Sequence, residues 1–379
     1  ALTHAPTIGI TRGTVPAPPA PVAPRPLWRR LAGPASIVAT AAATWAAFTI
    51  VERPTLLNVT RLTMSVPSDA PVAFSLDFRS LAVAPDGSSV AYLSAPVSPV
   101  TVAVRARLLV RRMDAFEPTL VADATDAPRT PFFSPDGAWI GFFHLANAGA
   151  GGEDQLKKVP AAGGPSSTIA TIDGPPRGAA WAPDGTIVFA TNGPTSGLQR
   201  ISADGGKPTV LTRPNVEKGE VDHVWPHMLP GGNAVLFTIA KQPIEQSAIA
   251  VLDLRDGTQK VVLNGGSDAR YLPSGHLVYG SVGTLRAVAF DLERLEVRGA
   301  PVPVVEQVVT SGGGAANFAV STDGTLTYVS GVVPGAVVIP RTLVWVDRAG
   351  REERLKAPPR NYFDAQLSPD GTRLALDIR

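Results

Sequence analysis

Residues 131–143 read Pro-Phe-Phe-Ser-Pro-Asp-Gly-Ala-Trp-Ile-Gly-Phe-Phe, which is an apolar run, a short polar turn and a second apolar run. In the turn, Pro135 presets φ for the first corner, Asp136 can bond the backbone beside it, and Gly137 can take the positive φ that closes the bend. The bulky residues on both sides suit buried strands. This stretch therefore predicts two antiparallel strands joined by a tight turn.

The same turn recurs at regular intervals along the chain. Its seven copies are Ala84–Gly87, Ser134–Gly137, Ala182–Gly185, Leu229–Gly232, Leu272–Gly275, Ser321–Gly324 and Ser368–Gly371. Their last glycines lie 43 to 50 residues apart. A period of this length, with several short strands in each repeat, is typical of propeller blades. We expect an all-β fold, a β-propeller of six to seven four-stranded blades, over residues 55–379.

Each period has room for four strands. In the fourth, the strand Val235–Thr238 is followed by Ala248–Leu254, a turn at Arg255–Gly257 and a last strand at Gln259–Leu263. Before the first repeat, Val59–Val66 alternates as a strand does, so we expect it to pair with the last blade and close the ring. The final repeat stops after two strands. Either that borrowed strand completes it, or the chain is a fragment of something longer and the propeller is incomplete at its C-terminus.

The amino-acid composition excludes several kinds of functional site and partner. The 379 residues include no cysteine, so disulfides, thiolate zinc sites and cysteine nucleophiles are excluded. The formal net charge is +2, but residues 1–51 contain four arginines and no acid, whereas residues 54–379 carry a net charge of −2. The predicted propeller is thus nearly neutral, and we expect no nucleic acid as a partner.

The N-terminal region has a composition of its own. Residues 1–30 are rich in Pro and Ala and predict a disordered cytoplasmic linker. Residues 31–51 form an uncharged stretch of 21 residues, which is long enough for one transmembrane helix. Four arginines precede it, so the positive-inside rule places the N-terminus in the cytoplasm and the propeller in the periplasm or outside the cell. A cleaved export signal is the alternative, in which case the propeller would be a soluble periplasmic protein.

The repeats resemble those of a known family. The order of Ser-Pro-Asp-Gly, an apolar strand and then Asp-Gly-Gly before a Leu-Thr strand is similar to TolB-type, WD40-like propeller repeats. Two stretches, His223–Gly232 and Leu343–Gly350, look like parts of the propeller ectodomains of bacterial receptor-type serine/threonine kinases. In that family a kinase, a proline-rich linker, one membrane span and a propeller follow in order. The resemblance implies a single-pass protein of the inner membrane whose propeller is a sensor.

Several common catalytic motifs are absent from the sequence. The sequence lacks the kinase set of a Gly-rich loop, His-Arg-Asp and Asp-Phe-Gly, the Gly-x-Ser-x-Gly of serine hydrolases and the phosphate-binding Gly-x4-Gly-Lys loop. We therefore predict that this chain is not an enzyme. Whether a kinase domain is encoded upstream of it is left open. The alternative is the accessory propeller of a longer kinase or peptidase, or a periplasmic scaffold of TolB type.

A few polar residues invite a functional interpretation, and each has a structural alternative. His223 and His227 are four residues apart, but in an extended chain that spacing is roughly 13 Å, so packing or hydrogen bonding is expected rather than a metal site. The turn aspartates are expected to bond backbone. Ser311–Gly314 reads as a flexible loop. Four tryptophans are expected to pack within blades: Trp139, Trp181, Trp225 and Trp345.

The sequence thus predicts a binding module. We expect it to engage a protein, peptide or envelope ligand through loops at one face of the ring. It names no catalytic, cofactor-binding or metal-binding residue and implies no cofactor.

Overall fold

The structure is a computed structural model of the chain, and it describes residues 62–67, 69–73, 78–95, 106–146, 152–193, 196–331, 342–346, 351–358, 360, 362–371 and 373–378. The chain separates into two compact units, residues 1–64 and 65–379. Every strand that the structure describes lies in the second unit. The predicted linker at 1–30 and the predicted span at 31–51 lie outside the described residues. Within the described part, no helix has both the length and the apolarity needed to cross a bilayer.

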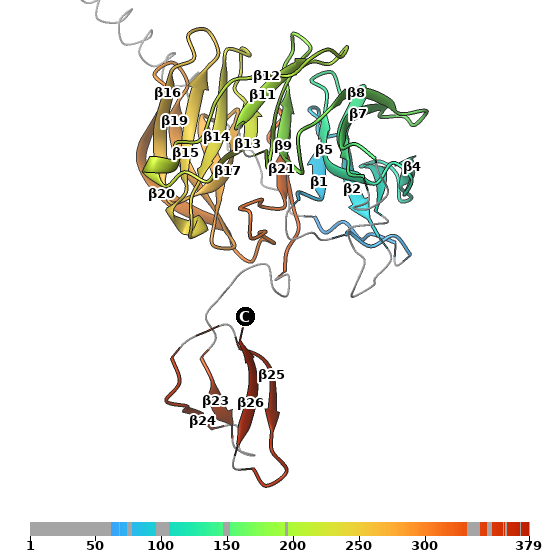
Figure 1. The fold of residues 1–379 in the computed structure, drawn as a ribbon. Coiled ribbons are helices and arrows are strands. Elements are labelled where there is room, and N and C mark those ends of the chain that lie inside the picture. Colours follow the sequence, from blue (N-terminus) through green and yellow to red (C-terminus); the bar gives the residue numbers. More distant parts are fainter. Residues whose placement is uncertain are drawn as a thin grey trace, which may run out of the picture. The chain divides into compact units, whose positions relative to one another are not determined.

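The second unit contains five four-stranded antiparallel sheets, which are the blades of a propeller (Figure 1). Blade 1 contains β1 (Leu81–Val83), β2 (Ser89–Ser94), β3 (Arg107–Arg112) and β4 (Thr119–Ala122). Blade 2 contains β5 (Pro128–Phe133), β6 (Trp139–His144), β7 (Gln155–Pro160) and β8 (Ser167–Thr171). Blade 3 contains β9 (Pro176–Trp181), β10 (Thr186–Thr191), β11 (Leu198–Ser202) and β12 (Thr209–Val210).

Blades 4 and 5 follow the same plan. Blade 4 contains β13 (Asp222–Met228), β14 (Ala234–Ala240), β15 (Ala248–Asp253) and β16 (Gln259–Asn264), with the 3-10 turns η1 (Val216–Lys218) and η2 (Ile244–Gln246) in its loops. Blade 5 contains β17 (Ser267–Leu272), β18 (His276–Ser281), β19 (Thr284–Asp291) and β20 (Glu296–Val305). Three two-stranded sheets come after it: β21 (Phe318–Val320) with β22 (Leu326–Tyr328), β23 (Val344–Val346) with β24 (Glu352–Arg354), and β25 (Tyr362–Leu367) with β26 (Leu374–Ile378).

The first strands of the sheets surround one axis. β1, β5, β9, β13, β17 and β21 contact one another in that order, and β21 contacts β1. Each blade therefore packs face to face on the next, and apolar cores fill the spaces between them. The second strands are buried on both faces, which explains runs such as Val235-Leu236-Phe237, in which all three side chains are buried. The prediction of an all-β propeller is confirmed.

The turn that organised the sequence also organises the blades. All seven copies join the first strand of a sheet to the second, and each last glycine has φ between +69° and +92°. Its N–H donates to the carbonyl three residues earlier, at 2.8 to 3.2 Å. The aspartate acts as expected: Asp136 Oδ1 accepts hydrogen bonds from Ala138 N and Ser134 Oγ. The prediction of turn chemistry at these positions is confirmed.

The predicted number of six to seven blades was wrong. Among the residues that the structure describes, five sheets have four strands, and the sixth and seventh turns join the two-stranded sheets β21–β22 and β25–β26. The physical reason is that this turn specifies a hairpin, whereas a blade needs two further strands hydrogen-bonded beside it. In the described residues after β22, the next hairpin, β23–β24, forms a sheet of its own.

Ring closure also differs from the expectation. Residues 62–66 of the expected strand Val59–Val66 are described and contain no strand, and residues 59–61 lie outside the described part. Instead, Thr322 donates from its backbone N and its Oγ1 to the carbonyl of Pro85, and Ser80 N donates to Asn317 Oδ1. These contacts join residues 237 positions apart and bring the β21–β22 hairpin against blade 1.

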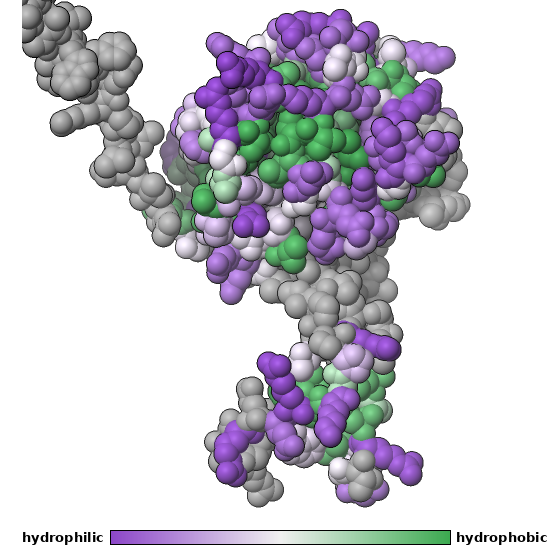
Figure 2. Space-filling model, turned by 90° about the vertical axis from the view of Figure 1, so that its left-hand side faces the viewer, coloured by the Kyte–Doolittle hydropathy of each residue, from purple (hydrophilic) through white to green (hydrophobic). Residues whose placement is uncertain are grey.

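The outer strands of blades 4 and 5 expose apolar side chains. Val261 on β16 and Val302 and Val304 on β20 are 45% to 55% exposed. Figure 2 shows apolar side chains gathered, within a hydrophilic surround, on the side of the molecule where these strands lie. Pro301 and Pro303 lie on β20, the edge strand of blade 5, and their nitrogens lack the hydrogen that a neighbouring strand would need.

Candidate functional site at the propeller axis

The inner strands of blades 2 to 5 share a backbone distortion at one position. Seven residues before the turn glycine, Thr130, Gly178, Trp225 and Asp268 all have positive φ, between +48° and +104°. At each of them the register with the second strand shifts, which marks a β-bulge. Three of the four are not glycine, and a bulky residue such as Trp225 adopts this conformation only when its surroundings impose it. The bulges re-aim the side chains that surround the axis.

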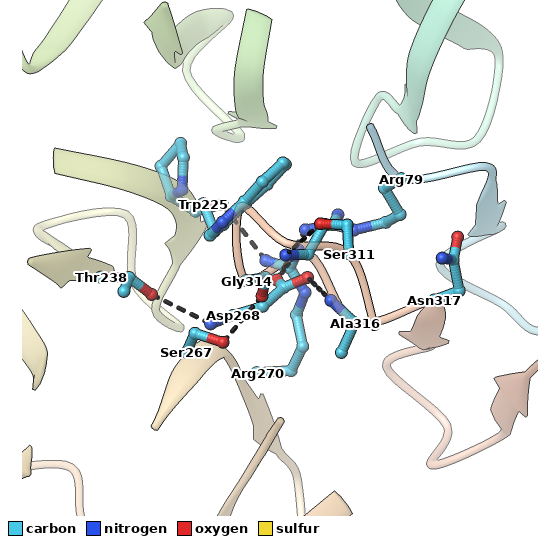
Figure 3. Close-up of polar contacts among 12 residues, drawn as sticks. Arg79, Trp225, Thr238, Ser267, Asp268, Arg270, Ser311, Gly314, Ala316 and Asn317 are labelled. Atoms are coloured by element: carbon cyan, nitrogen blue, oxygen red, sulfur yellow. Dashed lines mark hydrogen bonds and ion pairs between the residues drawn. The ribbon is translucent and has the colours of Figure 1, made fainter. Parts of the chain in front are cut away.

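Asp268 is the centre of a buried polar network (Figure 3). Its Oδ1 lies 2.6 Å from Arg79 Nη2 and 2.8 Å from Arg270 Nη2, its Oδ2 accepts from Ala316 N at 3.1 Å, and its own N–H donates to Thr238 Oγ1 at 2.9 Å. The carboxylate is fully buried. Burial raises the pKa of Asp268 to about 6, against the opposing effect of the Arg79 charge. The network thus joins blades 1, 4 and 5 to the loop that precedes β21.

Trp225 fixes the loop that closes this network. Its ring is fully buried, and its Nε1 donates to the carbonyl of Gly313 at 2.9 Å. The Arg79 guanidinium carbon lies 5.8 Å from the centre of the ring, which places the cation in contact with the indole system. Gly178 makes room for it, because a Cβ there would lie 3.0 Å from Trp225 Cα and Cε3. The indole is thus held between two neighbouring blades.

The segment Ser311–Gly314 is a structured part of the site. Ser311 Oγ accepts from Ala315 N at 2.9 Å, and Gly314 N donates to the Ser311 carbonyl. Ser267 Oγ donates to the Gly314 carbonyl at 2.7 Å. Ser311 is itself buried. The sequence analysis predicted a flexible loop here, and its serine and glycine residues do not reveal that side chains from distant blades hydrogen-bond to the segment.

A cavity of about 420 Å³ lies beside this network. Its walls come from four segments: the β14–β15 loop with η2, the link from blade 4 to blade 5, the β18–β19 turn and the loop before β21. Strands alternate in direction, so these segments share the face opposite the Pro-Asp-Gly turns. The lining residues are Gln242–Glu245, Gly265–Ser267, Gly280–Gly283, Thr310–Gly312 and Gly314.

The chemistry of the cavity is that of a pocket for neutral or weakly polar groups. Glycine backbone and the hydroxyls of Ser281 and Thr310 line it, together with the apolar side chains of Ile244 and Val282. Glu245 is the one ionisable residue of the lining. Such a wall binds through backbone N–H and C=O groups and through shape. The lining residue Ser267 directly precedes Asp268 in the chain, so the buried network supports the floor of the cavity at Ser267.

The two histidines named from the sequence do not lie in this cavity. They fall on β13, where the chain is extended as expected. His223 is buried, with Nδ1 2.9 Å from Thr212 Oγ1 and Nε2 3.1 Å from Glu220 Oε2, and its ring packs on Phe237. Its expected packing and hydrogen-bonding role is confirmed. His227 is partly accessible, and burial, with a smaller effect of the Arg79 charge, lowers its pKa to about 4. Within the described ranges, no group of three or more His, Asp or Glu residues could hold a metal ion.

The tryptophans divide between packing and exposure. Trp181 packs on Phe132 with ring centres 6.2 Å apart, and Trp225 is buried, so blade packing is confirmed for both. The Trp139 ring lies under the Lys158 ammonium at 5.3 Å. Trp345 on β23 is 50% exposed, which differs from the expectation.

The sequence analysis named Trp225 and Ser311–Gly314 but missed the polar centre of the network, which is Arg79, Ser267, Asp268 and Arg270. At the position seven residues before the turn glycine the four blades carry Thr, Gly, Trp and Asp, which share no chemistry. One usable signal existed. Eight residues before the glycine, three successive repeats carry Arg79, Arg129 and Arg177.

The chain was compared with protein families, curated proteins and solved structures. No protein-family profile and no curated protein matches the chain. Among solved structures, TolB from Acinetobacter baumannii is similar with a TM-score of 0.45 and 14% identity, over 60% of this chain and 54% of that one. A putative TolB from Agrobacterium tumefaciens has a TM-score of 0.48 and 17% identity, over 66% and 90%. The chain thus spans about half the length of the first of these proteins and most of the second.

One further match corrects a prediction. The oligogalacturonate lyase of Vibrio parahaemolyticus has a TM-score of 0.45 and 11% identity, over 65% of this chain and 72% of that one. The prediction that the chain is not an enzyme was therefore wrong as it was argued, because a protein that matches this propeller is itself an enzyme. The absence of kinase, serine hydrolase and phosphate-loop motifs does not decide the question. At this identity the match assigns no reaction to the chain.

Proposed function

We propose that this chain is a binding propeller that holds a short segment of a protein or peptide partner in the cavity beside Ser267. The observation that carries the proposal is the cavity itself, since its walls come from four loops of neighbouring sheets and its floor rests on a buried, hydrogen-bonded network. A site built on rigid elements can bind with little loss of conformational entropy. Its backbone-rich wall suits an extended chain that offers its own N–H and C=O groups.

Site-specific photo-crosslinking tests this proposal. Val282 lines the cavity and is 59% exposed, so a photoreactive residue there should form a crosslink to a bound partner. The control is Thr258, an exposed residue in the β15–β16 turn on the opposite face. Adding Gly312→Trp should abolish the Val282 crosslink, because Gly312 has ordinary φ, has open space around its Cβ position and lines the cavity. Equal crosslinks from both positions, or no effect of the tryptophan, would contradict the proposal.

We also propose that residues 31–51 anchor the protein in the inner membrane as a single span, with the propeller in the periplasm or outside the cell. The support is the uncharged 21-residue stretch and the four arginines before it. In this arrangement the propeller would be the sensor of a receptor-type kinase. Membrane fractionation of the full chain and of a chain without residues 31–51 tests the anchor. Protease treatment of spheroplasts tests on which side of the membrane the propeller lies, since a propeller in the cytoplasm would stay intact.

A further inference from the structure

Guanidinium groups outnumber carboxylates in the buried centre of the propeller. Arg79, Arg129 and Arg270 are only 4% to 5% exposed. Among described residues, the carboxylates buried to the same degree are Asp268 and Asp222. Asp222 is engaged elsewhere, since its Oδ1 accepts from His223 N and the charge of Arg177 acts to lower its pKa. Three buried arginines therefore stand against one remaining buried carboxylate, Asp268, and of the three only Arg79 and Arg270 contact it.

Asp268 cannot satisfy the two arginines that it contacts. Its Oδ1 is shared between Arg79 and Arg270, while Oδ2 is used by Ala316 N. Arg79 Nε is buried and makes no hydrogen bond within the described residues. Arg270 Nη2 lies 2.8 Å from Oδ1 but is not aligned to donate to it. Buried donors without acceptors are costly, and buried charges are normally paired.

Arg129 has no carboxylate partner in the described part of the chain. Its Nη1 donates only to the carbonyls of Ala127 and Pro128, at 3.3 and 2.7 Å, and its guanidinium carbon lies 5.9 Å from the centre of the Phe78 ring. Burial lowers the pKa of Arg129 to about 10, so the group remains charged at neutral pH. Phe78 directly precedes Arg79, and β1 and β5 contact each other, so Arg129 on β5 and Arg79, two positions before β1, come from neighbouring blades.

We propose that Arg79, Arg129 and Arg270 form an axial site for an oxyanion, a carboxylate or phosphate group. The planar guanidinium fork matches the oxygens of both. One such anion would offset the excess of positive charge and supply acceptors for the unpaired donors. The site is separate from the cavity and does not depend on the partner proposed for it.

Calorimetric titration of the full chain with inorganic phosphate, acetate and citrate in chloride buffer of constant ionic strength tests the site. We expect one anion per chain, and the comparison of phosphate with acetate and citrate shows which oxyanion is preferred. Arg129→Gln should weaken binding by roughly tenfold or more. Arg294→Gln, which removes an exposed arginine, should stay within about twofold of the wild type. Gly312→Trp should leave anion binding unchanged. No saturable binding, or equal binding by Arg129→Gln, would overturn the proposal.

Stability supplies a second readout that a purely structural arginine would not give. Without an oxyanion, Arg129→Gln should be at least as stable as the wild type, because it removes an unpaired buried charge. With saturating phosphate or citrate, the wild type should gain stability and the variant should not. A variant that is less stable by the same amount in every buffer would refute the site. If Arg129→Gln does not fold, Arg129→Lys replaces it in both measurements, since lysine keeps the charge but lacks the planar guanidinium group.

Discussion

Asp268 Oδ1 on β17 lies 2.6 Å from Nη2 of Arg79, the residue two positions before β1, so one ion pair joins the fifth blade to the start of the first. The two residues are 189 positions apart, and both side chains are buried. A propeller must hold its first and last sheets together to keep its edges covered. Here the task is shared by this ion pair and by the hydrogen bonds from Thr322 to Pro85.

Asp268→Asn should strongly destabilise the propeller. The change leaves Arg79 and Arg270 buried without their counterion, and breaking one partner of a buried pair costs about 3–5 kcal/mol. Urea denaturation of the full chain at neutral pH measures the loss. Asp114→Asn is the control, because Asp114 pairs with Arg112 at the same 2.6 Å while both side chains are more than 60% exposed. We expect no measurable change there, and similar losses for the two variants would contradict the assigned role of Asp268.

Gly178→Ala should destabilise the contact between blades 3 and 4. Gly178 has φ of +104°, and an added Cβ would lie 3.0 Å from two atoms of Trp225. Strain of this kind costs about 1–3 kcal/mol. Thermal unfolding measures it, with Gly312→Ala as the matched control, because that position has ordinary φ and open space. An equal melting temperature for both variants would show that Gly178 tolerates a side chain.

Trp225→Phe should loosen the segment 311–314 without unfolding the blade. The phenyl ring keeps most of the packing but loses the hydrogen bond to the Gly313 carbonyl, which is worth about 1 kcal/mol. Amide hydrogen exchange should therefore accelerate at Gly314 and Ala315. Trp181→Phe serves as the comparison, since Trp181 packs on Phe132 between blades 2 and 3. If exchange at 311–314 rises equally in both variants, Trp225 is not what fixes the loop.

Asp222 should make stability depend on pH in an identifiable direction. Burial raises the pKa of Asp222 from 3.8 to about 7, so between these values the folded state keeps a proton that the unfolded state releases. The wild type should therefore lose stability relative to Asp222→Asn as the pH rises from about 4 to 7, by on the order of 4 kcal/mol.

Denaturation of both proteins at several pH values in this range measures the difference. Asp136→Asn should show the opposite sign. The hydrogen bonds from Ser134 Oγ and Ala138 N lower the pKa of Asp136, so its contribution is present above the usual carboxyl range and is lost as the pH falls. If the difference in unfolding free energy between the wild type and Asp222→Asn does not change with pH, the pKa of the buried carboxyl is not raised.

The sequence alone was enough to predict the hairpins and the propeller class. Each turn depends on groups within a few residues: a glycine at positive φ, in five of the seven copies an aspartate before it, and apolar runs on both sides. All of these can be read from consecutive residues, and the seven turns form as expected. The count of blades could not be predicted in the same way, because the pairing of third and fourth strands depends on contacts beyond the turn.

The centre of the molecule was decided by the tertiary structure. The spacing of repeats does not reveal that the inner strands bulge at Trp225 and Asp268, or that Arg79 extends to a carboxylate 189 residues away. Nor does it show that Ser267 and Trp225 bond the loop before β21. These contacts join side chains from different blades, whose proximity arises only after the ring has closed. Local chemistry therefore determined the hairpins of this protein, and long-range packing around one axis determined its site.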